Sequence, residues 1–151
     1  MDLFIKKCIL IILFFSVFAI YAQVPKLVTE EEVPFFVKKT LRDLYPSVEI
    51  LEWNELSGNY TAKVNSSDSP GRINITGGGS FMSSEWDLET KYLPLKISNF
   101  LKENFSKFKI IRVFVEKKAK SNYVVDLYKK KGKLNKTLIF SLNGDFVEEK
   151  K

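Results

Sequence analysis

The chain has 151 residues, with 24 Lys and Arg against 18 Asp and Glu, no His and a single Cys. Without His, the sequence lacks a Ser-His-Asp triad, a Cys-His dyad, a His-based zinc motif and any imidazole general base. Carboxylates are then the only side chains suited to general acid and base catalysis, and their spacing alone leaves a two-carboxylate glycosidase open. Because no motif brings such a pair together, we expect a binding protein of about one domain and not an enzyme.

The first 22 residues have the pattern of a secretory signal peptide. Lys6 and Lys7 precede an almost wholly apolar run over residues 9–20, and a small residue, Ala22, follows. A basic start and an apolar run of about a dozen residues are typical of an export signal, whereas a transmembrane span needs roughly 20. We expect cleavage near Ala22 and a periplasmic or secreted protein; a retained N-terminal anchor is the alternative. Cys8 leaves with this segment, so we expect no disulfide, metal or cofactor.

An internal duplication follows. Val33-Pro34-Phe35-Phe36-Val37 returns sixty positions later as Leu93-Pro94-Leu95-Lys96-Ile97, and Gly79-Ser80-Phe81 returns as Gly144-Asp145-Phe146. The offset is constant within expected elements and grows in the loops, which is typical of a true repeat. We assign residues 23–90 to the first repeat and residues 91–151 to the second.

Each repeat is expected to begin with a helix of about 12 residues and to continue as antiparallel strands. Pro34 and Pro94 suit the first turn of a helix, and Pro46 ends the first one. Asn143-Gly144 indicates a tight hairpin. The strands expected in the two repeats are residues 48–53, 59–64 and 72–76, and residues 110–116, 122–129 and 136–142 with a short return after Gly144.

These features resemble the PepSY-like proteins related to β-lactamase inhibitors, which are small periplasmic or secreted bacterial proteins. The resemblance rests on the two Val/Leu-Pro helices, on Tyr45-Pro46 and Trp53, and on the closing Asn143-Gly144-Asp145-Phe146. It implies an α+β fold in which both repeats form one sheet, with helices on one face and the other face open to a protein partner. It implies no catalytic residue. Residues 76–81 lack the Asp-rich turn of such repeats, so no calcium role is expected.

Alternating side chains in the second repeat separate a covered face of the sheet from an open one. We expect the apolar sets to pack under the helices: Ile111, Val113, Val115, Tyr123, Val125, Leu127, Leu138, Phe140 and Leu142. The opposite face presents the residues that we assign to partner binding: Arg112, Phe114, Val124, Tyr128, Lys130 and Ile139. Aromatic residues and Arg are frequent at binding hot spots. The alternative is that these side chains only cover one another on a solvated sheet. The first repeat is polar on this face, and Trp53 is expected in the core.

Charge is distributed unequally between the repeats. Residues 23–90 carry a net charge of −5 and residues 91–151 carry +10. Seven lysines near the expected hairpins form a candidate anionic-surface site: Lys117, Lys118, Lys120, Lys129, Lys131, Lys133 and Lys136. Such a field attracts acidic partners, although Lys also protects sheet edges from aggregation.

Two function hypotheses follow. The first is a non-catalytic binding module, either an inhibitor of or an adaptor for an envelope protein or peptide. The alternative is an envelope-associated protein that binds anionic lipid or lipopolysaccharide through its Lys-rich hairpins. Nucleic acid is not an expected partner of an exported protein.

Overall fold

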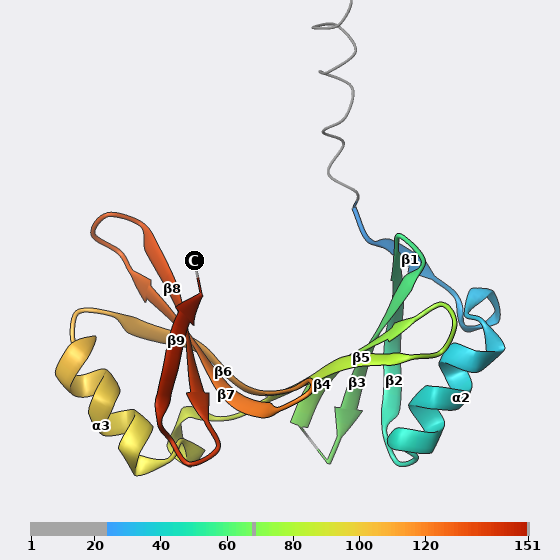
Figure 1. Cartoon of the computed structure of the whole chain (residues 1–151). Helices are drawn as coiled ribbons and strands as arrows, with labels where there is room; N and C mark the ends of the chain where they lie inside the picture. Colours follow the sequence, from blue (N-terminus) through green and yellow to red (C-terminus); the bar gives the residue numbers. More distant parts are fainter. Residues whose placement is uncertain (1–23, 68, 151) are drawn as a thin grey trace, which may run out of the picture.

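The computed structural model describes residues 24–67 and 69–150. The expected signal peptide and its cleavage site lie outside these residues. The described chain forms one nine-stranded antiparallel sheet, in which the strands follow one another in chain order (Figure 1). The same residues form two α-helices, which lie at the outer flanks of this sheet. The expected α+β fold, with one sheet shared by both halves of the chain, is confirmed.

The same order of elements occurs twice. The first half contains β1 (Lys26–Val28), the 3-10 turn η2 (Glu30–Glu32), α2 (Phe35–Leu44), β2 (Glu49–Leu56), β3 (Asn59–Ser66), β4 (Ser69–Thr76) and β5 (Phe81–Asp87). The second half contains η3 (Thr90–Tyr92), α3 (Leu95–Asn104), β6 (Lys109–Lys117), β7 (Ser121–Lys129), β8 (Leu134–Ser141) and β9 (Phe146–Lys150). A 3-10 turn, a helix and four strands therefore follow each other in both halves.

Proline sets the start of each helix. Pro34 and Pro94 immediately precede α2 and α3, where a missing backbone N–H leaves no hydrogen bond unmade. Each helix has 10 residues, slightly fewer than expected. Helix α2 ends at Leu44 because the residue before Pro46 disfavours the α conformation.

Two apolar cores lie between the helices and the sheet. The first consists of Val33, Val37, Leu41, Trp53, Ala62, Val64, Ile73 and Ile75. The second consists of Leu93, Ile97, Leu101, Val113, Val125, Leu127, Leu138 and Phe140. Corresponding members stand 60 positions apart through the helix and its first strand, then 63 and 65 positions apart in the next two strands. The two halves therefore bury the same positions, and Trp53 is a core residue as expected.

Each half also carries two β-bulges at matching places. Leu51 in β2 and Ile111 in β6 have no partner in the strand register, nor do Met82 in β5 and Val147 in β9. All four side chains are exposed, by 46% to 60% of their area. Bulges thus place four apolar side chains outside both cores.

The bulge at Ile111 changes which residues of β6 face the helix. An extra residue shifts the alternation by one, so Ile110 and Val113 both pack in the second core. The expectation that Ile111 packs under the helices is therefore wrong. The same expectation is wrong for Leu142, which is 53% exposed because β8 ends at Ser141 and Leu142 lies in the following turn.

Gly79 closes the turn between β4 and β5 against helix α2. Its φ is +87°, and a Cβ built on it would lie 2.9 Å from both the Cβ and the carbonyl oxygen of Phe36. We expect Gly79→Ala to lower the free energy of unfolding by about 1.5 kcal/mol, through left-handed strain and through this contact. Gly58 has a φ of +77° and no atom within 4 Å of the added Cβ, so Gly58→Ala is the matched control. Urea unfolding measures the free energy of unfolding of both variants. If Gly79→Ala loses no more stability than Gly58→Ala, the close contact between residue 79 and Phe36 is contradicted.

Asp145 joins the β8–β9 turn to helix α3. Its carboxylate accepts a hydrogen bond from Lys96 Nζ, and this bond lowers the pKa of Asp145 below its usual value. Because the folded pKa is below the unfolded one, the pair stabilises the fold above about pH 4 and is lost as the pH falls through the folded pKa. We expect Asp145→Asn to weaken the loss of stability on acidification. Urea unfolding at about pH 7 and about pH 3 measures this loss of stability. If the loss is the same in the variant and in the unchanged protein, a stabilising Lys96–Asp145 pair is contradicted.

Candidate functional site

The face of the sheet that points away from the helices is concave, and among residues 24–67 and 69–150 no helix covers it (Figure 1). In the first half, polar side chains bridge neighbouring strands on this face. Thr61 Oγ1 donates to Asn74 Oδ1 at 2.7 Å, and Asn74 Nδ2 donates to Ser83 Oγ at 2.9 Å. Lys63 Nζ lies 2.6 Å from Glu52 Oε1. This half of the face is therefore hydrophilic, as its sequence indicates.

Arg112 lies where the two halves meet. Its Nε donates to Asp87 Oδ1 at 2.8 Å, and its Nη2 donates to Glu85 Oε2 at 3.0 Å. Its guanidinium lies over the ring of Phe114, 4.0 Å from the centroid. Arg72 extends the cluster, with its Nη1 3.6 Å from the same Glu85 oxygen. One side chain of β6 thus links two carboxylates of β5 and covers an aromatic ring.

The charge of Arg112 follows from these contacts. Partial burial lowers the pKa of the guanidinium, but the hydrogen bonds to Asp87 and Glu85 raise it, and the net effect is a raised pKa. The side chain is 26% exposed, so part of its charge reaches solvent. The two carboxylates balance the charge of Arg112 and hold its guanidinium in one orientation on the open face.

Three more of the predicted partner-binding residues lie beside Arg112. Phe114 is the cross-strand partner of Val124, and Val124 is the partner of Ile139. All three point away from the helices, as expected, yet they are only 6%, 0% and 5% exposed. The expectation that they are accessible anchors is wrong, because Arg112 covers the Phe114 ring and the three side chains lie next to one another on paired strands.

The remaining two predicted residues lie farther along. Tyr128 is half-buried near the end of β7, where its register partners are Lys109 and Asn135. Lys130 is exposed in the turn after β7. The structure therefore brings together Arg112, Phe114, Val124 and Ile139, and leaves Tyr128 and Lys130 at the margin.

The seven lysines of the candidate anionic-surface site do not form one patch. Lys117, Lys118 and Lys120 lie at one end of β7, and Lys129, Lys131, Lys133 and Lys136 lie at the other. A nine-residue strand separates these ends by about 30 Å. Lys118 also lies 2.7 Å from the buried carboxylate of Glu116, and Lys136 pairs with Glu149. The lysines therefore form two separate groups of positive charge, one at the β6–β7 turn and one at the β7–β8 turn.

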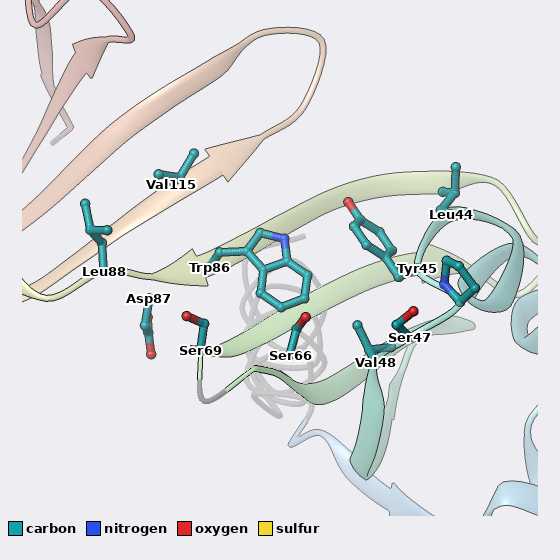
Figure 2. Close-up of a pocket in the computed structure, with 11 residues that line it drawn as sticks. Leu44, Tyr45, Ser47, Val48, Ser66, Ser69, Trp86, Asp87, Leu88 and Val115 are labelled. Atoms are coloured by element: carbon teal, nitrogen blue, oxygen red, sulfur yellow. The ribbon is translucent and has the colours of Figure 1, made fainter. Parts of the chain in front are cut away.

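A pocket that the sequence analysis did not identify lies on the helix side, where β5 and β6 join the halves. It has a volume of about 510 Å³. Its lining residues are Leu44, Tyr45, Pro46, Ser47, Val48, Ser66, Ser69, Trp86, Asp87, Leu88 and Val115. Figure 2 shows the indole of Trp86 across the middle of the pocket, with Tyr45 on one side and Leu88 on the other. The pocket and the concave face therefore lie on opposite sides of the same junction.

Neither a metal centre nor a membrane-crossing helix is present among the described residues. Across residues 24–67 and 69–150, no group of three or more His, Cys, Asp or Glu side chains is arranged to hold a metal ion. Over the same ranges, no helix has the length and apolar character needed to cross a membrane.

Solved structures share this fold. A proposed periplasmic protein of Bacteroides eggerthii matches with a TM-score of 0.69 and 16% identity, over 78% of this chain and 88% of that one. A BLIP-like protein of Bacteroides fragilis matches with a TM-score of 0.67 and 18% identity, over 76% and 83% of the chains. A DUF2874 family protein of Bacteroides uniformis matches with a TM-score of 0.69 and 15% identity, over 78% of this chain and 88% of that one. No family model matches the chain, and no curated protein matches its sequence.

Proposed function

We propose that the protein is an exported, non-catalytic binding module that holds a protein or peptide partner on the concave face of its sheet. The observation that carries this proposal is the Arg112 cluster, in which the guanidinium is fixed by Glu85 and Asp87 above Phe114. A side chain that is already fixed loses little conformational entropy when a partner binds. Arg is also frequent among residues that dominate binding energy.

The fold likeness supports the same proposal. One similar structure is a proposed periplasmic protein and another is BLIP-like. We propose that this chain is a PepSY-like protein of two repeats, exported by a signal peptide cleaved near Ala22. Its role is that of an inhibitor of, or an adaptor for, an envelope protein or peptide.

Removing the charge of Arg112 tests the proposal. The mature chain is immobilised, its partner is recovered from envelope extract and identified, and its affinity is then measured with purified components. We expect Arg112→Met to weaken that affinity at least tenfold, about 1.4 kcal/mol, because a hot-spot contact is lost. Lys102→Met on the outer surface of α3 is the matched control, since Lys102 is exposed and lies on the other side of the sheet.

A second variant keeps this test decisive if Arg112→Met is unstable. Arg72 belongs to the same cluster but is 50% exposed, so Arg72→Met changes the surface with little effect on folding. Unchanged affinity in both Arg variants contradicts binding at the concave face.

A second candidate function is association with anionic lipid or lipopolysaccharide. Lys130, Lys131 and Lys133 are exposed in the β7–β8 turn, and within the described residues they have no ion-pair partner, which favours this candidate. Binding to anionic vesicles that disappears near 1 M salt, where the Debye length is about 3 Å, supports it. Vesicle binding that survives replacement of all three lysines by Gln contradicts it.

A further inference from the structure

We infer that the pocket around Trp86 is a separate binding site for an uncharged saccharide. The inference goes beyond the proposed function, because this pocket lies on the helix side of the sheet and the partner face is the concave one. Its volume of about 510 Å³ falls within the range of small-molecule sites in proteins, about 300–1,000 Å³.

Trp86 provides a fixed aromatic platform. A Cβ built on Gly71 would lie 2.6 Å from Cε3 and 2.8 Å from Cζ3 of Trp86, so the six-membered ring of the indole rests directly on the backbone of β4. The indole also lines the pocket, between Tyr45 and Leu88 (Figure 2). A flat, rigid ring of this kind offers a large apolar area to a ligand at little loss of conformational entropy.

Tyr45 holds the platform in place from the side. Its ring centroid lies 5.6 Å from that of Trp86 at an interplanar angle of 53°. Its hydroxyl donates to Ser84 Oγ at 2.9 Å, and Ser84 is fully buried. The two rings are therefore oriented by the sheet before any ligand binds.

The rim of the pocket supplies unpaired polar groups. Ser47, Ser66 and Ser69 line it, and within residues 24–67 and 69–150 none of their hydroxyls has a hydrogen-bond partner. The indole N–H of Trp86 likewise has no partner among those residues. A ligand that fills the pocket must supply hydrogen bonds to these groups, because leaving them dry costs about 1–3 kcal/mol each.

The charged residues at the pocket limit the chemical class of ligand that it can hold. Among the described residues that line it there is no Lys or Arg, and the carboxylate of Asp87 pairs with Arg112. Phosphorylated and carboxylate ligands therefore find no counter-ion among these described lining residues. An acyl chain fits the apolar floor but leaves the rim hydroxyls unpaired. A pyranose ring meets both demands, since its flat C–H face can lie on the indole while its hydroxyls bond to the serines.

The two tryptophans make the site directly observable by NMR. Cellobiose, maltose and N,N′-diacetylchitobiose are titrated in turn to about 10 mM, which covers millimolar affinity, while the indole N–H resonances of the mature protein are recorded. Trp53 is 3% exposed in the first core, so its resonance, assigned with a Trp53→Phe variant, is an internal control. We expect at least one disaccharide to shift the Trp86 resonance saturably and to leave that of Trp53 unmoved.

Variants and other ligands decide the interpretation. Trp86→Leu should abolish saccharide binding; Ser69→Tyr, which fills the exposed rim, should weaken it at least tenfold and serves if Trp86→Leu does not fold. Octanoate and p-cresol represent an acyl chain and a tyrosine side chain. No shift with any of the three disaccharides overturns the inference, as does a shift with octanoate or p-cresol alone.

Discussion

Replacing Phe114 by alanine is expected to lower the free energy of unfolding by about 3 kcal/mol. The ring is 6% exposed, lies opposite Val124 in the neighbouring strand and is covered by the guanidinium of Arg112. Truncation removes buried apolar area and leaves a cavity beneath Arg112 that the curved sheet cannot fill. Urea unfolding of the variant, compared with the unchanged protein, measures the loss.

Ile111 is the matched control for Phe114. It is three residues away in the same strand, but the bulge leaves it 60% exposed, so Ile111→Ala should change stability by no more than about 0.5 kcal/mol. Strict alternation along β6 predicts the reverse, with Ile111 in the core and Phe114 at the surface. A larger loss for Ile111→Ala than for Phe114→Ala therefore contradicts the bulge and the structure of the concave face.

Replacing Arg112 by methionine is expected to lower the free energy of unfolding by about 2 kcal/mol. Methionine keeps much of the aliphatic length but leaves Glu85 and Asp87 without their hydrogen-bond donor. Breaking a buried pair costs about 3–5 kcal/mol, and we reduce this figure because the Arg112 and Glu85 side chains are 26% and 21% exposed. Thermal or urea unfolding gives the value.

An exposed ion pair provides the comparison for Arg112. Lys39 lies 2.6 Å from Asp43 on α2, with both side chains more than half exposed, so Lys39→Met should cost about 0.5 kcal/mol or less. A double-mutant cycle between Arg112→Met and Glu85→Gln should give a coupling energy of about 1 kcal/mol. Additive losses in that cycle contradict a direct link between β5 and β6 through these side chains.

The fold was largely predictable because its strongest signals are local. Pro34 and Pro94 mark two helix starts, and Asn143-Gly144 marks the last hairpin. The repeated spacing of apolar residues indicates one covered face in each half. Each of these signals comes from the backbone preferences of single residues or from the spacing of apolar residues along the chain, so a short stretch of sequence is enough to show it.

The positions of the bulges and the existence of β5 were not predictable from such local signals. The only local mark of the bulges at Leu51 and Ile111 is a pair of adjacent apolar residues, Ile50-Leu51 and Ile110-Ile111, and such a pair does not show which of its two members faces the core. β5 begins after a glycine-rich loop and buries Ser83 and Ser84 instead of apolar side chains. Its polar interior is satisfied by Tyr45 and Asn74, which come from distant elements.

The candidate site was also predictable only in part. The direction in which Arg112 points follows from alternation along β6, but its partners Glu85 and Asp87 belong to β5, and only the pairing of β5 with β6 brings them together. Trp86 reaches its pocket through the same pairing. Both surfaces at the junction are tertiary features, so no short sequence pattern encodes them.

Site-specific photo-crosslinking compares the two faces of the sheet most directly. A photoreactive residue is placed at Lys63 or Arg72 on the concave face, or at Lys39 or Lys102 on the outer surfaces of the helices, all of them exposed. The purified partner is added and irradiated with each protein. We expect covalent adducts from the two concave positions and none from the two helix positions; adducts from the helix positions alone, or equal yields from all four, contradict partner binding at the concave face.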